Sequence, residues 1–134
     1  MSRLTFGLAL ATSLLSSVAL AETQAEIAAR ENEEGKTLVF SGKYAEASEK
    51  FQNAVARVPE PKYFVNLCAS RFSEGKFGEA LTACNAAEKN GDDKVKEKTA
   101  KLITKIREEA QKQGDMFVAD LKPVGPQQST LELS

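Results

Sequence analysis

Apolar residues recur every three or four positions along most of this chain, which is the spacing of one face of an α-helix. Turn-forming residues interrupt the pattern at Ser41-Gly42, Pro59, Glu74-Gly75 and Asn90-Gly91. Between these interruptions the pattern predicts five helices, over residues 25–40, 44–57, 61–73, 77–89 and 93–112. The sequence therefore predicts an all-α fold.

Two of the predicted helices carry the same sequence pattern. The segment 42–54 returns 33 residues later as 75–87, with glycine, lysine, an aromatic residue, glutamate and alanines at matched positions. A period in the low thirties in a chain of this kind is typical of stacked helical hairpins. The matched residues are those that close helix packing needs, so the repeat predicts architecture and not chemistry.

The last predicted helix and the residues after it differ from the repeat. Residues 93–112 place Val95, Leu102, Ile103 and Ile106 on one stripe and charged residues around the other faces. That distribution is typical of a terminal helix that covers an array and exposes a polar back. We expect residues 113–134 to form a flexible tail, in which the apolar run 116–118 can dock back onto the domain.

The repeated segments resemble the tetratricopeptide repeat (TPR) family. The turn glycine, the aromatic, the small residues and a closing proline stand at the family's positions in 42–59, and the pattern returns in 75–87. The run Asn66-Leu67-Cys68 resembles the family's Asn-Leu-Gly run. The resemblance implies a short α-solenoid of two TPR-like hairpins plus a C-terminal capping helix. Glu31 and Glu34 stand where the family buries apolar groups, which predicts an exposed end of the array at this point.

The first residues have the features of a secretory leader. Arg3 precedes an apolar run from Leu4 to Leu15, and Ala19-Leu20-Ala21 then supplies a small-x-small cleavage pattern. The sequence thus predicts a cleavable signal peptide over 1–21, a helical domain over 22–112 and the tail over 113–134. The mature protein would be exported to the periplasm or secreted, and would not span the membrane.

Composition narrows the function. The chain has no histidine, so the commonest general base and zinc ligand are both missing, and we expect no enzymatic activity, metal or cofactor. The net charge of −1 gives no overall attraction to nucleic acid. Charge is unevenly placed, however, because residues 22–34 carry five Glu and one Arg, whereas 92–112 carry seven Lys or Arg and five Asp or Glu.

Cys68 and Cys84 fall on facing sides of consecutive predicted helices, at equal distance from the turn between them. In an oxidising compartment they have the placement of a disulfide, which would stabilise a short array. The alternative is two small buried residues on helices too far apart to be bridged. Both interpretations stay open at this point.

The resemblance also implies a binding surface. In the TPR family the first helices of the units line a concave groove, and the corresponding residues here are Asn32, Lys36, Val39, Phe40, Lys62, Val65, Asn66, Ala69, Phe72 and Lys96. Some family members clamp a peptide carboxylate with Asn and Lys side chains in this groove. Asn66 and Lys96 match that clamp, while Asn32 and Lys36 have its residue types in swapped order. The alternative is that these side chains serve local hydrogen bonding and solvation.

The resulting hypothesis is a non-enzymatic module of the cell envelope that binds a protein or peptide through its concave face, as an adaptor or assembly factor. A second hypothesis is a structural homo-oligomer in which array ends stack between copies, the acidic first helix against the basic last helix.

Overall fold

The computed structural model describes residues 21–120, and within this range the chain is all helical with no strand. The elements in chain order are α1 (Gln24–Phe40), α2 (Tyr44–Arg57), α3 (Pro61–Ser73), α4 (Phe77–Asn90), α5 (Asp93–Lys112) and α6 (Met116–Asp120). The all-α prediction is confirmed, and the five predicted helices are present with ends that agree to within one residue. The predicted leader cleavage falls at the edge of this range, and residues 1–20 and 121–134 lie outside it.

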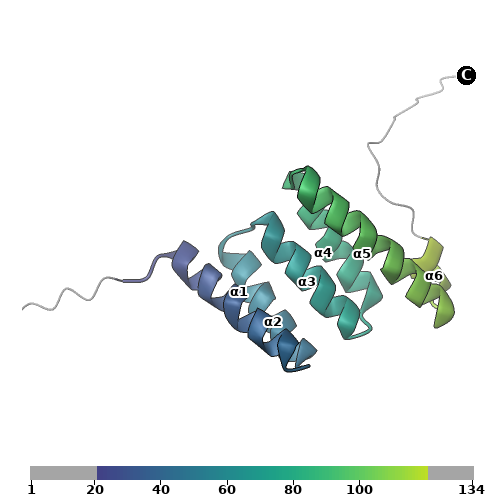
Figure 1. Ribbon diagram of the computed structural model, residues 1–134, viewed down its shortest axis with the longest axis horizontal. Coiled ribbons are helices and arrows are strands. Elements are labelled where there is room, and N and C mark those ends of the chain that lie inside the picture. The colour runs from purple at the N-terminus through teal and green to yellow at the C-terminus, as the bar shows by residue number, and fades with distance from the viewer. Residues whose placement is uncertain (1–20, 121–134) are drawn as a thin grey trace, which may run out of the picture.

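The helices form two layers. α1 packs along α2 and α3 packs along α4, each pair joined by a short turn, and α2 packs against α3 (Figure 1). α5 then packs against both α3 and α4. As a result α1, α3 and α5 lie side by side in one layer, with α2 and α4 behind them (Figure 1).

Small residues allow the helices to approach closely. Ala28, Ala47, Ala54 and Ala80 are fully buried at the helix crossings. Gly35 of α1 faces the ring of Phe51 on α2, and a Cβ at this position would lie 2.6 Å from the Phe51 Cε1 atom. An aromatic ring therefore fills the space that a glycine leaves open, and α1 and α2 can approach closely at this point.

Three turns in the structure have the same geometry, although the sequence repeat includes only two of them. Gly42, Gly75 and Gly114 have φ angles of 73°, 78° and 79°, a left-handed conformation that glycine adopts without a Cβ clash. The residue after each glycine donates its backbone N–H to the carbonyl five positions before it, at 2.8–3.0 Å. α5 and α6 thus form a third hairpin whose second helix is only five residues long.

This third hairpin corrects the predicted domain boundary. The proposed flexible tail over 113–134 begins instead with the turn at Gly114 and helix α6, which packs on α5 and buries Val118. The run 116–118 was expected to dock back onto the domain, and Val118 does so, whereas Met116 is 53% exposed. The sequence signal was a glycine followed two residues later by an apolar residue, as in the other two turns.

The prediction that Glu31 marks an exposed end of the array is wrong. Glu31 is buried, and its Oε2 atom lies 3.0 Å from Nε of Arg57 on α2. Glu34 in turn pairs with Lys50 of α2. These ion pairs neutralise carboxylates at sites where apolar residues were expected, so α1 stays packed on α2 through charge as well as apolar contact.

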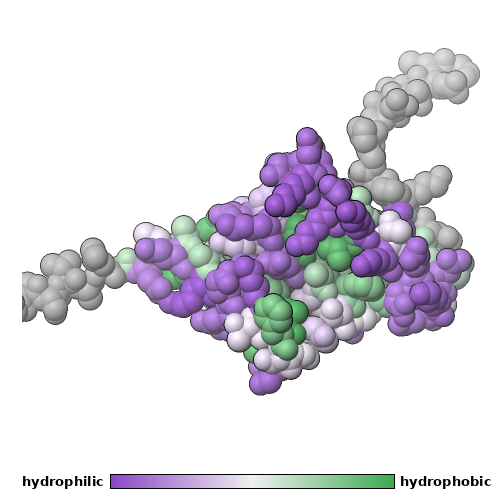
Figure 2. All heavy atoms as spheres, viewed as in Figure 1, coloured by the Kyte–Doolittle hydropathy of each residue, from purple (hydrophilic) through white to green (hydrophobic). Residues whose placement is uncertain are grey.

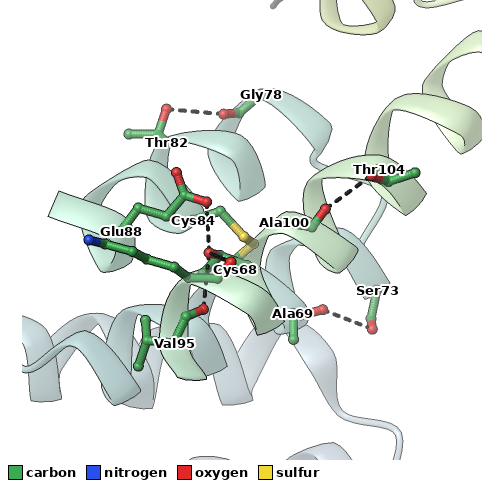
Figure 3. Close-up of a disulfide and its surroundings, with 12 residues drawn as sticks. Cys68, Ala69, Ser73, Gly78, Thr82, Cys84, Glu88, Val95, Ala100 and Thr104 are labelled. Atoms are coloured by element: carbon green, nitrogen blue, oxygen red, sulfur yellow. Dashed lines mark hydrogen bonds between the residues drawn. A yellow bond between two sulfur atoms is a disulfide. The ribbon is translucent and has the colours of Figure 1, made fainter. Parts of the chain in front are cut away.

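Cys68 of α3 and Cys84 of α4 form a disulfide, and both residues are fully buried (Figure 3). Their Cα atoms are 5.2 Å apart, so the helices lie within the range that a disulfide spans. A neighbouring hydrogen bond joins α5 to the same hairpin, because the Thr99 hydroxyl donates to Oε1 of Glu88 at 2.8 Å. The disulfide therefore lies at the centre of the described fold.

Candidate functional site

A cavity of about 430 Å³ opens on the face formed by α1, α3 and α5. Each of the three helices contributes to its wall, and α5 does so with its first turns only. We call this cavity the groove. Its lining residues are Ala29, Asn32, Glu33, Lys36, Lys62, Tyr63, Val65, Asn66, Asp92, Lys94, Val95 and Lys98.

A side-chain hydrogen bond joins two walls of the groove. The Nδ2 atom of Asn66 on α3 donates to Oδ1 of Asn32 on α1 at 2.8 Å. Asn32 is 4% exposed, and Val65 and Tyr63 beside it are also buried. The floor of the groove is thus apolar, with one amide pair that fixes α1 relative to α3.

Four lysines stand around this floor, and they differ in their pairing. Lys36 contacts Glu33 at 2.6 Å, and Lys62 contacts Glu60 at 2.8 Å. Lys94 and Lys98 form no ion pair with any residue in the range 21–120. Figure 2 shows hydrophilic residues over the N-terminal part of α5 on this face. The α5 side of the groove therefore carries two ammonium groups without ion-pair partners in the described range, next to the carboxylate of Asp92.

The charges on α1 and α3 act on one another. The ammonium of Lys36, which donates a hydrogen bond to Glu33, lowers the pKa of that carboxyl below its usual 4.5, and Lys62 of α3 lowers it further. The pKa of Lys62 is raised, first by Glu60 and to a smaller degree by the aromatic side chain of Tyr63 and by Glu33. Both side chains are accordingly ionised at neutral pH.

We expect the Glu33 ion pair to contribute stability that depends on pH. Because folding lowers the pKa of Glu33, its contribution is present above 4.5, the unfolded value, and is lost as the pH falls through the folded pKa. A Glu33→Gln variant should melt slightly below the parent at about pH 7 and coincide with it near about pH 3. Thermal unfolding followed by circular dichroism tests this, with Glu49→Gln on α2 as a control. A melting difference that grew on acidification would contradict the expectation.

The N-terminus of α5 lies at the groove but is already capped. The side chain of Asp92 accepts a hydrogen bond from the backbone N–H of Val95 at 2.9 Å, which caps the first turn of α5. The carboxylate of Asp92 also puts a negative charge on the groove wall. An isolated phosphate would be repelled by this carboxylate. The wall therefore suits a ligand that has acidic groups for the lysines and N–H donors for Asp92.

The groove contains only part of the predicted site. Asn32, Lys36, Lys62, Val65 and Asn66 line it as predicted from the resemblance. Val39 and Phe72 pack partly against the core and Ala69 is half-buried. Phe40 is 91% exposed and lies outside the cavity.

Lys96 is the prediction that the geometry corrects most clearly. It is exposed on α5 but does not line the groove, whereas Lys94 and Lys98 do. Residues two apart on a helix point about 200° from one another, so Lys96 points away when its neighbours point in. The carboxylate clamp assigned to Asn66 and Lys96 is therefore not assembled, because only Asn66 lines the groove, and its amide is bonded to Asn32.

Sequence reasoning missed the acidic members Glu33 and Asp92, the buried Tyr63, and the lysine pair of α5. The pair had a signal, because Lys94 and Lys98 are one helical turn apart and flank Val95, an apolar residue at the start of the helix. Tyr63 gave no such signal, because an aromatic residue at helical spacing can equally pack in the core or line a binding surface.

Two kinds of reactive site are not found in the part of the chain that the structure describes. In the range 21–120 there is no cluster of side chains that could hold a metal ion, and no cysteine is free. None of the helices α1 to α6 is long and apolar enough to cross a membrane.

A smaller cavity of about 250 Å³ lies on the other side of α3, between α2 and α4.

Comparison with known proteins places the chain in no family. No family model, no curated protein and no solved structure matches it.

Proposed function

We propose that this protein is a TPR-like module that binds another protein or peptide through the groove, and that it acts without chemistry as an adaptor or assembly factor. The observation that carries the proposal is that one cavity is shared by three parallel helices, each of which contributes polar side chains to it. A cavity whose wall is shared by three helices can contact an extended peptide segment from all three of them. The repeated hairpin turns and the close helix crossings support the TPR-like assignment.

The proposed setting is the cell envelope. The leader pattern at the start of the chain supports export, and the buried disulfide supports folding in an oxidising compartment such as the periplasm. In that setting the protein would meet its partner after export.

In-cell photo-crosslinking tests the proposed function. A photo-reactive amino acid at Ala29, which is exposed and lines the groove, should capture a defined envelope protein. The matched control is Ala45, exposed on α2 in the other layer, which should not capture it. Equal capture from both positions, or none from Ala29, would contradict the proposal.

Homo-oligomerisation is the second candidate, and charge placement favours it. α1 and its flank are rich in glutamate, α5 is rich in lysine, and the two helices lie at opposite ends of the array (Figure 1). Stacking of one copy on the next would be weakened by salt. Light scattering that finds a monomer at all protein concentrations and at low salt would remove this candidate.

A further inference from the structure

Five of the six lysines of α5 lie on one stripe of the helix. They are spaced four, three, four and seven residues apart, and each of these steps returns a side chain to the same face. At about 100° per residue the five fall within an arc of about 60°, and no acidic residue of α5 falls inside that arc. We call this set the lysine stripe: Lys94, Lys98, Lys101, Lys105 and Lys112.

The lysine stripe is long and open to solvent. All five lysines are exposed, and from the first to the last the helix rises by about 27 Å. The stripe begins at the groove, which Lys94 and Lys98 line, and continues past it to the end of α5. Figure 2 shows hydrophilic side chains along α5 on this face. The row of ammonium groups therefore extends well beyond the cavity.

The packing of α5 does not account for the lysine stripe. α5 packs on α3 and α4 through a different side, which carries its buried residues. Lys101 contacts Glu97 at 2.6 Å and Lys112 contacts Glu109 at 3.6 Å, whereas the other three lysines have no ion-pair partner among the residues that the structure describes. Like charges one turn apart disfavour a helix slightly. The stripe is thus a row of positive charge that the fold does not require.

We propose that the lysine stripe docks on a surface of anionic phospholipid headgroups, with α5 lying along the membrane. Each lysine close to such a surface strengthens attachment by roughly fivefold, so a row of five produces a measurable affinity. The apolar side of α5 is buried in the fold, so the attachment is electrostatic and involves no insertion of the helix. The inference goes beyond the proposed function, because it concerns how the module is held at the membrane while the groove binds a partner.

The composition of the lysine stripe favours lipid over protein or nucleic acid. Protein interfaces are depleted in lysine and enriched in arginine and aromatic residues, and the stripe contains neither of the enriched kinds. Arg107, the one arginine of α5, is half-buried and lies outside the arc. Lysine acts as a compact point charge, whereas arginine presents the planar fork suited to nucleic-acid recognition. A row of point charges matches a plane of mobile headgroup phosphates, which needs no fixed shape.

Co-sedimentation with lipid vesicles tests the proposal. The probes are vesicles of phosphatidylglycerol mixed with phosphatidylcholine, and vesicles of phosphatidylcholine alone. We expect the protein to sediment with the anionic vesicles only, and to be released as salt rises from about 50 mM to about 500 mM, because salt screens the attraction. Absence of binding to anionic vesicles at low salt, or equal binding to both kinds, would overturn the proposal.

Three substitutions outside the groove test the lysine stripe itself. Lys101→Gln with Lys105→Gln and Lys112→Gln removes three positive charges and leaves the groove lysines in place. At roughly fivefold per lysine, affinity for anionic vesicles should fall by about tenfold to a hundredfold. The three side chains are exposed, so melting followed by circular dichroism should stay close to that of the parent.

The matched control removes the same charge from other exposed positions: Lys43→Gln with Lys89→Gln and Lys96→Gln. Lys96 belongs to α5 but points away from the lysine stripe. This control should retain affinity within about fivefold of the parent. An equal loss in both triple variants would show that net charge, and not the stripe, determines attachment.

A protein partner at the lysine stripe is the competing outcome. A photo-reactive amino acid at Glu108, which is exposed beside the stripe, reports on it in cells. Capture of one defined protein from this position, lost when Lys101, Lys105 and Lys112 are replaced by Gln, would make the stripe a protein interface and overturn the lipid assignment. Capture from Ala29 in the groove tests the proposed function separately, because the groove lysines are unchanged in that variant.

Discussion

Replacement of both cysteines by alanine, as Cys68→Ala with Cys84→Ala, should lower the free energy of unfolding by about 3 kcal/mol in the chain-entropy description. The disulfide closes a loop between residues separated by 16 positions, and both side chains are fully buried in the contact between α3 and α4. For a domain of this size the loss corresponds to a melting temperature lower by roughly 10–20 °C. Circular dichroism melting of the two proteins gives the value.

Reduction provides the control for this expectation. A reductant should lower the melting temperature of the parent protein and leave that of the double alanine variant unchanged. A parent whose melting temperature did not respond, or a variant as stable as the parent, would show that the disulfide adds nothing to the fold. Alanine is the right replacement here, because serine would place an unsatisfied hydroxyl in the core.

The second large effect is expected at Phe51, the aromatic residue that fills the α1–α2 hairpin. Phe51→Ala should cost about 3–5 kcal/mol, because it removes a side chain that is 1% exposed and leaves a cavity. Phe40→Ala, at a phenylalanine that is 91% exposed, should change stability by less than about 0.5 kcal/mol. Urea unfolding of both variants measures the difference.

The close contact of Phe51 with Gly35 makes a sharper test. In the parent, Gly35→Ala should destabilise, because the new methyl group would lie 2.6 Å from the phenyl ring. In the Phe51→Ala background the ring is gone, and Gly35→Ala should stabilise by about 1 kcal/mol through its higher helix propensity. An effect of the same sign in both backgrounds would contradict the packing described here.

The helices could be predicted from the sequence because the signals that determine where a helix begins and ends are local. Turn glycines, Pro61 and the capping residue Asp92 act within a few positions of the chain, and the structure has helix ends beside each of them. The third hairpin was missed because its second helix stops after five residues, too few for a helical period to be evident.

The groove was harder to predict than the fold. The resemblance indicated which face of each helix lines it, and so Asn32, Val65 and Asn66 were placed correctly. On α5 the rotation of the helix about its own axis depends on packing against α3 and α4, which no local signal fixes. Lys96 was therefore expected in the groove, whereas Lys94 and Lys98, two positions away on either side, line it.

The burial of Glu31 had a similar cause. A glutamate among apolar positions predicts exposure unless a partner is known, and Arg57 lies 26 positions further along the chain. The pairing depends on how α2 returns along α1, which is a property of the hairpin and not of either segment alone.

The place of the disulfide has a consequence for motion. It ties α3 to α4, the central hairpin, and leaves α1 with α2 and α5 with α6 free of covalent constraint on either side. In a linear array each unit is stabilised only by its neighbours, so amide hydrogens of α3 and α4 should exchange most slowly and those of the flanking hairpins faster. The central wall of the groove, α3, is then expected to fluctuate less than the outer walls, α1 and α5.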